Sequence, residues 1–145
     1  MSDVPQWLAM RSALWPGCSL KDHKRETAEF FHDTRNQPVW VAEAANEELA
    51  GFLEVSVRNY AEGAGRVNVG YLEGWYVKPG FRKQGIGHAL VKAAEYWATR
   101  RGFTHMASDT ELDNEISLKS HLAMGYREVE RGIHFLKKLK PRERS

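Results

Sequence analysis

Hydrophobic side chains recur at intervals of three and four residues in three segments of the chain, which is the period of an amphipathic helix, and a fourth helix is indicated by Gly125 at its end. Residues that cap or end helices stand at the borders of these segments. Pro16 and Gly17 end the first segment, Ser19 can cap the helix of the second, and Gly102 ends the third. The predicted helices run from Ser2 to Leu14, from Ser19 to before Pro38, from Gly85 to Arg101 and from Asn114 to Met124.

The segments between these helices are rich in β-branched residues or alternate between hydrophobic and polar residues, which is typical of strands. The polar turn Asn46–Glu48 separates the first two such runs and so predicts a hairpin. The predicted strands cover Val39–Ala45, Leu49–Asn59, Val67–Val77 and Phe103–Ser108, and Tyr126–Leu139 is expected to form two short strands or a bent hairpin. This order predicts a mixed α/β fold whose sheet combines hairpins with strand–helix–strand crossovers.

The chain has the length and composition of one globular domain covering residues 1–145: of its 145 residues, 42% are hydrophobic and 28% are charged. Cys18 is the one cysteine, so an intrachain disulfide and a zinc site built from several thiolates are excluded, and no metal is expected. This cysteine usage fits a reducing compartment, and the sequence contains neither a signal peptide nor an apolar run of about 18 residues. We therefore expect a cytoplasmic protein without a membrane partner.

The formal net charge of +2 divides unevenly along the chain. Residues 137–145 form a basic tail with a charge of +4, and the remaining residues sum to −2. A nucleic-acid-binding protein usually carries its basic residues as a patch on the folded body. The mildly acidic body therefore favours a solvated tail and no nucleic-acid partner.

A glycine-punctuated turn joins the strand that ends near Val77 to the helix that begins near Gly85. Unpaired N–H groups at such a helix N-terminus, together with the positive end of the helix dipole, bind anions, and glycines let phosphate oxygens approach closely. The segment lacks the Gly-Lys-Ser/Thr of a nucleoside triphosphate loop and the Gly-x-Gly-x-x-Gly of dinucleotide-binding folds. It predicts an anion-binding turn of another kind.

Two motifs, in this order, make the interpretation more specific. Arg82-x-x-Gly85-x-Gly87 follows a Val-x-Pro strand end, and at helix length comes Asn114-x-x-Ser117-x-x-x-His121-x-x-x-Gly125-Tyr126. Together they resemble the acetyl-CoA-binding core of the GNAT N-acetyltransferases. The resemblance implies a mixed, mostly antiparallel sheet flanked by helices, with a central splay between strands that admits acetyl-CoA.

Further segments narrow the resemblance to one branch of that superfamily. They are Leu14–Gly17, Tyr71–Gly74, Met106–Thr110 and Asn114–Ser117. Over nearly its whole length the chain is similar to the aminoglycoside 6′-N-acetyltransferases, which implies acetylation of the 6′-amine of these antibiotics, hence resistance. The family commonly forms homodimers, and Tyr126, His134 and Phe135 offer an interface. The chain departs from the family at its N-terminus, where the family's first strand is shortened or absent.

The resemblance places the cofactor contacts on the third predicted strand, on the turn after it and at the head of the last helix. Gly74, a glycine inside a strand, marks a bulge or a close approach of another backbone, consistent with a splay at this point, although a glycine required only for packing is the alternative. The residues implied in binding acetyl-CoA are Trp75, Tyr76, Val77, Arg82, Lys83, Gln84, Gly85, Ile86, Gly87, His88 and Asn114.

On the acceptor side, the resemblance implies an acidic and aromatic site formed by Trp15, Tyr60, Glu73, Asp109 and Glu130. Carboxylates and rings suit a rigid polycation with apolar sugar faces. Carboxylates gathered in this way repel one another, so a cation is expected to fill the site.

The same resemblance suggests how the transfer proceeds. Glu73 is expected to orient or deprotonate the amine, Asp109 to hold neighbouring ammonium groups, and His121 to protonate the departing thiolate. Cys18 is a poor nucleophile candidate because no recognisable base motif lies near it. We therefore expect direct transfer without a covalent enzyme intermediate.

Other interpretations remain open on the sequence. The cofactor core also fits an acetyltransferase acting on a polyamine, another metabolite amine or a protein amino group, and a non-enzymatic module could bind acyl-CoA or an aminoglycoside. Single residues also allow structural roles: Glu73 and Asp109 as surface carboxylates, Trp15 and Tyr60 as partly buried core, and Asn114 as an N-cap.

Overall fold

The computed structural model of the chain describes residues 3–142. Ser2 of the predicted first cap and Arg144 of the predicted basic tail lie outside the described residues. Four α-helices are present: α1 (Val4–Leu14), α2 (Leu20–Phe30), α3 (Ile86–Arg100) and α4 (Glu115–Ala123). They confirm the four helices predicted from the sequence. The Ser19 side chain caps α2 by accepting from the Asp22 N–H at 3.1 Å.

The four strands form one sheet in the order β1-β2-β3-β4. Their bounds are Val39–Glu43 for β1, Leu49–Arg58 for β2, Val69–Val77 for β3 and Met106–Ser108 for β4. β1 and β2 form the predicted hairpin, β2 and β3 pair antiparallel, and β4 runs parallel to β3. Within residues 3–142 no strand precedes α1. The mixed, mostly antiparallel sheet agrees with the fold class predicted from the sequence.

Two irregularities in β3 create the central splay. The pairing of β2 with β3 passes from Glu54 opposite Gly74 to Val55 opposite Leu72, so Glu73 is the extra residue of a β-bulge. On its other side, β3 pairs with β4 through three residues, Gly70–Leu72. From Glu73 onward the edge of β3 that faces β4 is open.

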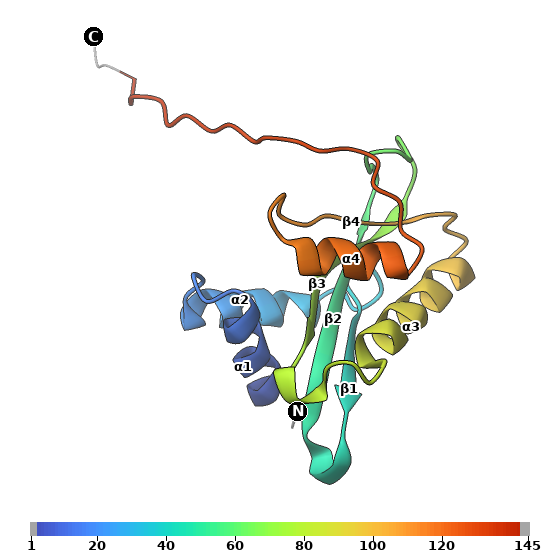
Figure 1. Cartoon of the computed structure of the whole chain (residues 1–145). Helices are drawn as coiled ribbons and strands as arrows, with labels where there is room; N and C mark the ends of the chain where they lie inside the picture. Colours follow the sequence, from blue (N-terminus) through green and yellow to red (C-terminus); the bar gives the residue numbers. More distant parts are fainter. Residues whose placement is uncertain (1–2, 143–145) are drawn as a thin grey trace.

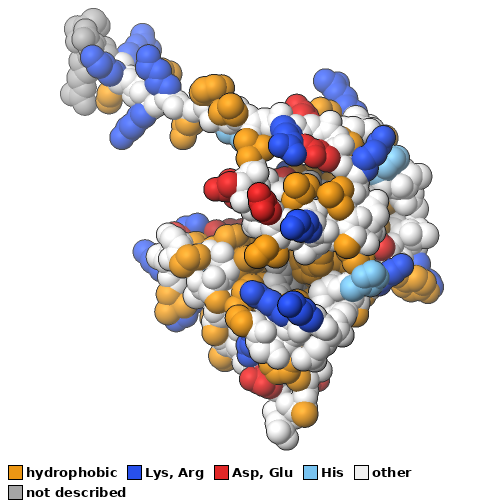
Figure 2. Space-filling model, viewed as in Figure 1, with side chains coloured by type: hydrophobic (Ala, Val, Ile, Leu, Met, Phe, Trp, Pro, Cys, Tyr) orange, Lys and Arg blue, Asp and Glu red, His pale blue; other side chains and the backbone are white. Residues whose placement is uncertain are grey.

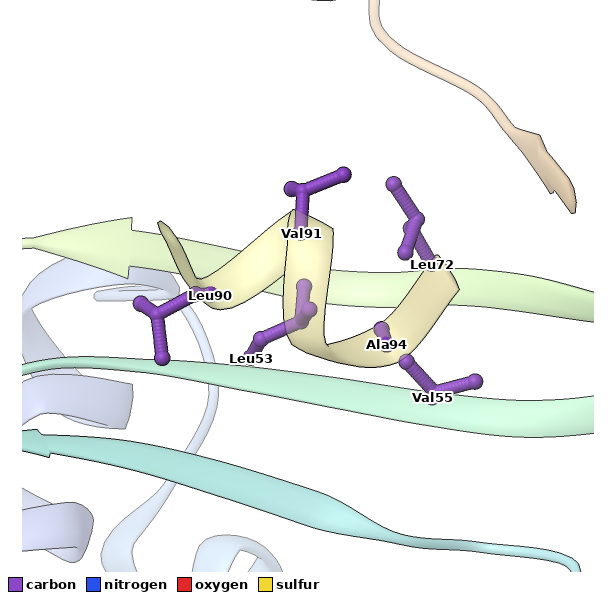
Figure 3. Packing of buried hydrophobic residues seen from close by; sticks show 6 residues of the cluster. All are labelled: Leu53, Val55, Leu72, Leu90, Val91 and Ala94. Carbon is purple, nitrogen blue, oxygen red and sulfur yellow. The ribbon is translucent and has the colours of Figure 1, made fainter. Parts of the chain in front are cut away.

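The helices cover the two faces of the sheet as the alternation in β2 dictates, with α1 and α2 on one face and α3 on the other (Figure 1). Leu53 and Val55 face α3 and pack with its buried residues, as Figure 3 shows. Phe52 points the opposite way, into a second cluster with Trp7 and Met10 of α1. The face toward α1 and α2 also carries the polar side chains of the site. None of the helices in residues 3–142 is long and apolar enough to cross a membrane.

The expectation of strands over Tyr126–Leu139 is wrong. Residues 127–142, all of them described, contain no helix or strand. The first part of the segment passes beside Gly63, and the last part extends away from the body (Figure 1). Basic side chains are spaced along this C-terminal segment (Figure 2). Phe135 is 91% exposed, and Ile133, Leu136 and Leu139 are also exposed. Alternating side chains favour a strand, but a strand forms only beside a partner strand, and this segment has none in residues 3–142 of the single chain.

Candidate active site

Glu73 lies in the bulge of β3, and two side chains of β2 donate hydrogen bonds to its carboxylate. Arg58 donates from Nε to Oε2 at 2.8 Å and from Nη2 to Oε1 at 2.7 Å, which is the bidentate geometry of a strong guanidinium–carboxylate pair. Ser56 Oγ also donates to Oε2. Ser56 and Arg58 are two residues apart in β2 and therefore project from one face. Protein donors thus occupy both oxygens of Glu73.

Arg58 also links Glu73 to the second predicted acceptor carboxylate, Asp109. The guanidinium carbon lies 3.5 Å from the centre of the Tyr71 ring, a cation–π contact, and Tyr71 Oη donates to Asp109 Oδ2 at 2.8 Å. Burial, reinforced by this hydrogen bond, raises the pKa of Tyr71. The phenol therefore keeps the proton that it donates. We call Glu73, Arg58, Tyr71 and Asp109 the Glu73–Asp109 network.

A cavity of about 550 Å³ opens between α2, the end of α1 and the sheet. Trp15 forms part of its wall. Four carboxylates and one guanidinium also line it: Glu26, Glu29, Glu54, Glu73 and Arg11. An acidic cavity with an aromatic wall suits a cation that also has apolar surface.

The wall residue Trp15 is fixed by contacts on several sides. Its ring stacks on that of His23 with centroids 6.4 Å apart and meets Phe52 edge-on at 6.3 Å. The Arg11 guanidinium carbon lies 4.8 Å from the ring centre. The indole also packs against Gly74, so of the two features expected at this glycine the bulge is present and the close approach of another backbone is not found in the described part of the chain. The approaching group in this structure is the indole.

Beneath the cavity, Arg11 and Glu54 form a buried ion pair, with each side chain 3% exposed. Trp7 Nε1 donates to Glu54 Oε2 at 2.9 Å, and Arg11 donates to both Glu54 oxygens and to Glu26. Burial raises the pKa of Glu54, while the positive charge and hydrogen bonds of Arg11 oppose that rise. This network ties α1 and α2 to β2 and supports Trp15.

Cys18, His23 and Glu26 place one potential metal-ligand atom each within 4.8 Å of one another. The hydrogen bonds of these residues favour a structural role over a metal site. His23 Nδ1 accepts from Arg11 Nε at 3.2 Å, and its Nε2 donates to the Trp15 carbonyl at 3.3 Å, so both ring nitrogens are engaged. Glu26 is paired with Arg11, whose positive charge would also repel a metal ion.

The acceptor residues predicted from the sequence do not all meet in one cavity. Trp15 and Glu73 line the acidic cavity, whereas Asp109 and Glu130 line a second, larger one of about 1360 Å³ below the C-terminal segment. Tyr60 follows β2 and is 52% exposed. The Glu73–Asp109 network connects the two cavities, because Tyr71 lines the second one. Glu130 lies in the segment whose predicted strands are not formed.

The cofactor side begins where β3 ends. Gly85 caps α3 in the left-handed conformation with φ of 81°, and Lys83 before it has φ of 64°. The first backbone bond from the N-cap runs from the Ala89 N–H to the Gly85 carbonyl at 2.9 Å. The N–H groups of Ile86, Gly87 and His88, in the first turn of α3, therefore have no partner within the helix and are available to bind an anion. Arg82 Nε donates to the Val77 carbonyl at 2.9 Å and holds the turn against β3.

His121 of α4 lies against the open edge of β3. Its ring meets that of Trp75 edge-on at 5.4 Å. Nδ1 donates to the Ser117 carbonyl at 2.7 Å, which leaves Nε2 to accept from Ser108 Oγ, also at 2.7 Å. Asn114 caps α4 by accepting from the Ser117 N–H at 3.0 Å, so its N-cap role is present.

Several residues of the site were missed from the sequence, namely Ser56, Arg58, Tyr71, Arg11 and Glu54. The strand β2 did contain a signal for three of them. Glu54-x-Ser56-x-Arg58 places polar residues at every second position of an otherwise hydrophobic strand, directly before Tyr60. Polar residues on the covered face of a sheet need partners, so this pattern predicts a polar site.

Comparison with known proteins agrees with this arrangement. The model of the acetyltransferase (GNAT) family matches residues 5–126. The chain therefore belongs to the GNAT acetyltransferase family.

Within that family, the relatives confirm the resemblance to the aminoglycoside 6′-N-acetyltransferases. The aminoglycoside N(6′)-acetyltransferase type 1 of Klebsiella aerogenes is 49% identical over 130 residues, which are 88% of this chain and 86% of the relative. The solved structure of AAC(6′)-Iy in complex with the bisubstrate analog CoA-S-monomethyl-acetylneamine has a TM-score of 0.87 at 34% identity, covering 95% of this chain and 93% of that one. The enzyme AAC(6′)-IG from Acinetobacter haemolyticus has a TM-score of 0.88 at 33% identity, with 96% and 94% covered.

Proposed function

We propose that the chain is an acetyl-CoA-dependent N-acetyltransferase that acetylates the 6′-amine of aminoglycoside antibiotics and so confers resistance. The observation that carries this proposal is the arrangement along β3. Glu73 faces the acidic cavity beside Trp15, and the residues directly after it run along the open edge to the turn before α3. A single strand thus joins an anion-binding helix end to a cavity suited to a cation. AAC(6′)-Iy, a structural relative, binds an analog that joins CoA to a neamine derivative.

Acetyl-CoA, when bound, supplies an acetyl thioester. The diphosphate would be held by the outward N–H groups around Gly85 and Gly87, with Arg82, Lys83, Gln84, Ile86 and His88 in the same turn. The open backbone of Trp75, Tyr76 and Val77 would bind the pantetheine arm as an additional strand does, with Asn114 at the head of α4 on the far side of the splay. The fit rests on unpaired donors and an unpaired strand edge, which are what this ligand requires.

The acceptor amine would be held by Glu73, with Trp15 against a sugar face and Asp109 near other ammonium groups. Tyr60 and Glu130 remain proposed members of this site. A neutral amine must be presented to the thioester, and Glu73, directly or through a water, would take the proton from the ammonium form. As the new C–N bond forms and the C–S bond breaks, the nitrogen releases its second proton and the departing thiolate takes one up. His121 Nε2, which carries no proton while it accepts from Ser108 Oγ, lies beside Trp75 and would take the proton from the nitrogen and pass it to the thiolate.

A substrate panel tests the proposal. Release of CoA is followed with a thiol reagent, using aminoglycosides with a 6′-amine, aminoglycosides with a 6′-hydroxyl, spermidine, amino acids and a lysine peptide. We expect turnover with the 6′-amino compounds alone. Faster turnover of spermidine or the peptide would indicate an acetyltransferase with a different acceptor. Tight binding of acetyl-CoA or an aminoglycoside without release of CoA would indicate a binding module.

Variants of Glu73 and Asp109 test whether these two residues bind the acceptor. Glu73→Gln and Asp109→Asn keep the size of each side chain and remove its charge, and Glu73→Gln also loses one of the two hydrogen bonds from Arg58 because an amide NH2 cannot accept. Each variant should lower kcat/KM for tobramycin by about tenfold or more. Acetyl-CoA affinity should stay unchanged because neither residue belongs to the turn before α3. Unchanged kcat/KM in both variants would contradict the acceptor site.

We further propose that the enzyme works in the cytoplasm as a homodimer. β4 forms one edge of the described sheet, and the C-terminal segment leaves Phe135 and Ile133 exposed. A segment of this kind from a second copy can pair with such an edge. Light scattering should give twice the chain mass of 16.6 kDa, and the double substitution Ile133→Asp, Phe135→Asp should give the single mass. A wild-type monomer would contradict the dimer.

A further inference from the structure

Two guanidinium groups reach the acidic cavity region, and their surroundings differ. Arg11 is buried, with its side chain 3% exposed, and donates to two carboxylates and His23. Arg58 ends β2, and its side chain is 44% exposed. Removing Arg11 from its partners would break the junction of α1, α2 and β2. Arg58 can turn into solvent without disturbing the buried core, because solvent already reaches it.

Arg58 stands where the acceptor site needs a cation. Its two hydrogen bonds to Glu73 are 2.7 and 2.8 Å long and use both carboxylate oxygens. Ser56 Oγ takes a further position on Oε2. An ammonium group that approaches Glu73 therefore meets a carboxylate whose charge is already paired. It can bind there with full strength only if it replaces at least one guanidinium bond.

The environment of Arg58 suits such a replacement. Its guanidinium rests on the Tyr71 ring, and Tyr71 donates to Asp109, so a positive charge beside this ring is stabilised by two carboxylates and an aromatic face. A substrate ammonium satisfies the same three groups. The repulsion between carboxylates that an empty acceptor site would suffer is thus relieved by a side chain of the protein itself.

We propose that the Arg58 guanidinium holds, in the free protein, the position beside Glu73 that an ammonium group of the acceptor takes in the complex, so that acceptor binding exchanges one cation for another. The inference rests on the proposed function, because it takes the acceptor to be a polyamine-like cation such as an aminoglycoside. Arg58 then lowers acceptor affinity and acts as a specificity-determining residue. A ligand that carries no positive charge has no means of displacing it.

Calorimetry with tobramycin tests the exchange on the full chain. Arg58→Met keeps the length of the side chain and removes its charge, and Arg58→Lys keeps the charge. We expect Arg58→Met to bind tobramycin about two- to fivefold more tightly than wild type, the range typical of a partly exposed ion pair, and Arg58→Lys to stay near wild type. Arg58→Met should also show a steeper salt dependence, since its site carries one more negative charge. Acetyl-CoA affinity, measured alongside, reports that both variants are folded.

The alternative is that Arg58 fixes Glu73 in place. Arg58→Met would then bind tobramycin more weakly or have a lower kcat, and Arg58→Lys would recover the affinity or kcat of wild type. This result would overturn the exchange. Equal affinity in all three proteins, with turnover intact, also overturns it and leaves the proposed function standing. If wild type binds acetyl-CoA but neither binds nor acetylates tobramycin, the proposed function fails and the exchange with it. In wild type, the Nε–H resonance of Arg58, assigned by its absence in Arg58→Met, should shift on addition of tobramycin.

Discussion

The indole of Trp15 lies so close to Gly74 that a Cβ added to this glycine would come within 2.5 Å of Trp15 Cη2. Gly74 sits next to the bulged Glu73 on β3, and Trp15 follows α1. The contact therefore sets the distance between an aromatic wall and the main carboxylate of the proposed acceptor site. Neither residue can be changed in size without moving the other.

We predict that Gly74→Ala raises KM for the acceptor by displacing Trp15 from the cavity wall. The overpacking should also lower the free energy of unfolding by about 1–3 kcal/mol. Steady-state kinetics and urea unfolding measure the two effects. Gly17→Ala is the matched control because nothing lies within 4 Å of its added Cβ. Equal KM values in both variants would show that Trp15 does not contact the acceptor.

Gly85→Ala should weaken acetyl-CoA binding. Gly85 has φ of 81°, where a side chain costs about 1–2 kcal/mol, and it caps the end of α3 that we expect to bind the diphosphate. Gly102 has φ of 83° at the other end of the same helix, and its added Cβ also meets no atom within 4 Å. Calorimetry should give a weaker acetyl-CoA affinity for Gly85→Ala and an unchanged one for Gly102→Ala, although both lose stability. A similar affinity in both variants would argue against this turn as the diphosphate site.

Glu54→Ala should be strongly destabilising because it removes the buried partner of Arg11 and leaves this buried guanidinium paired only with the partly exposed Glu26. Breaking a buried ion pair in this way typically costs about 3–5 kcal/mol. Urea unfolding should show that the double variant Arg11→Met, Glu54→Leu is more stable than Glu54→Ala alone. The exposed pair of Asp22 and Arg25 on α2 provides the control, since Arg25→Ala should cost less than about 1 kcal/mol. A double variant no more stable than Glu54→Ala would mean that the cost is not electrostatic.

The Tyr71 phenol should make stability fall as pH rises above about 10, the ordinary pKa of tyrosine. Its folded pKa is raised by burial and by the bond to Asp109, so the unfolded chain releases this proton at a lower pH than the folded chain does. The stabilising contribution is complete below the unfolded pKa and is lost above it. Unfolding in urea at pH 9 and pH 11 should show a smaller loss for Tyr71→Phe than for wild type. An equal loss would mean that Tyr71 does not cause it.

The sequence predicted the secondary structure well wherever local pattern and packing agree. Hydrophobic spacing indicated α1, α2 and α3, and Gly125 indicated the end of α4. The alternation on either side of Asn46–Glu48 indicated the β1–β2 hairpin. The same alternation failed for Tyr126–Leu139. A strand forms only beside a partner strand, and this segment has no partner strand among residues 3–142.

For the candidate site, sequence motifs identified many of the residues, whereas the pairing of the strands determines which of them lie close together. Glu73, Gly74 and the turn before α3 belong to one continuous stretch of sequence, so their relation was predictable. Arg58 and Tyr71 were missed because their role arises from the pairing of β2 with β3 and from a one-residue bulge. Gly74 indicated a bulge or a close approach, but it did not indicate which residues of β2 lie opposite β3. The alternation on each strand is the same whichever residues it faces, so the pairing register cannot be predicted from either strand alone.

The bulged strand β3 carries the proposed amine-binding carboxylate and the proposed donor-binding backbone on successive residues. Consecutive positions in extended backbone advance by roughly 3.3 Å, so covalent bonds alone determine how far apart the two reactants are placed. Substitutions in the helices, the loops or an interface with another copy can therefore change which amines bind, while the distance between the bound amine and the thioester stays the same. A one-residue insertion within Glu73–Trp75 would change that distance at once, and we expect such insertions to be the least tolerated in the molecule.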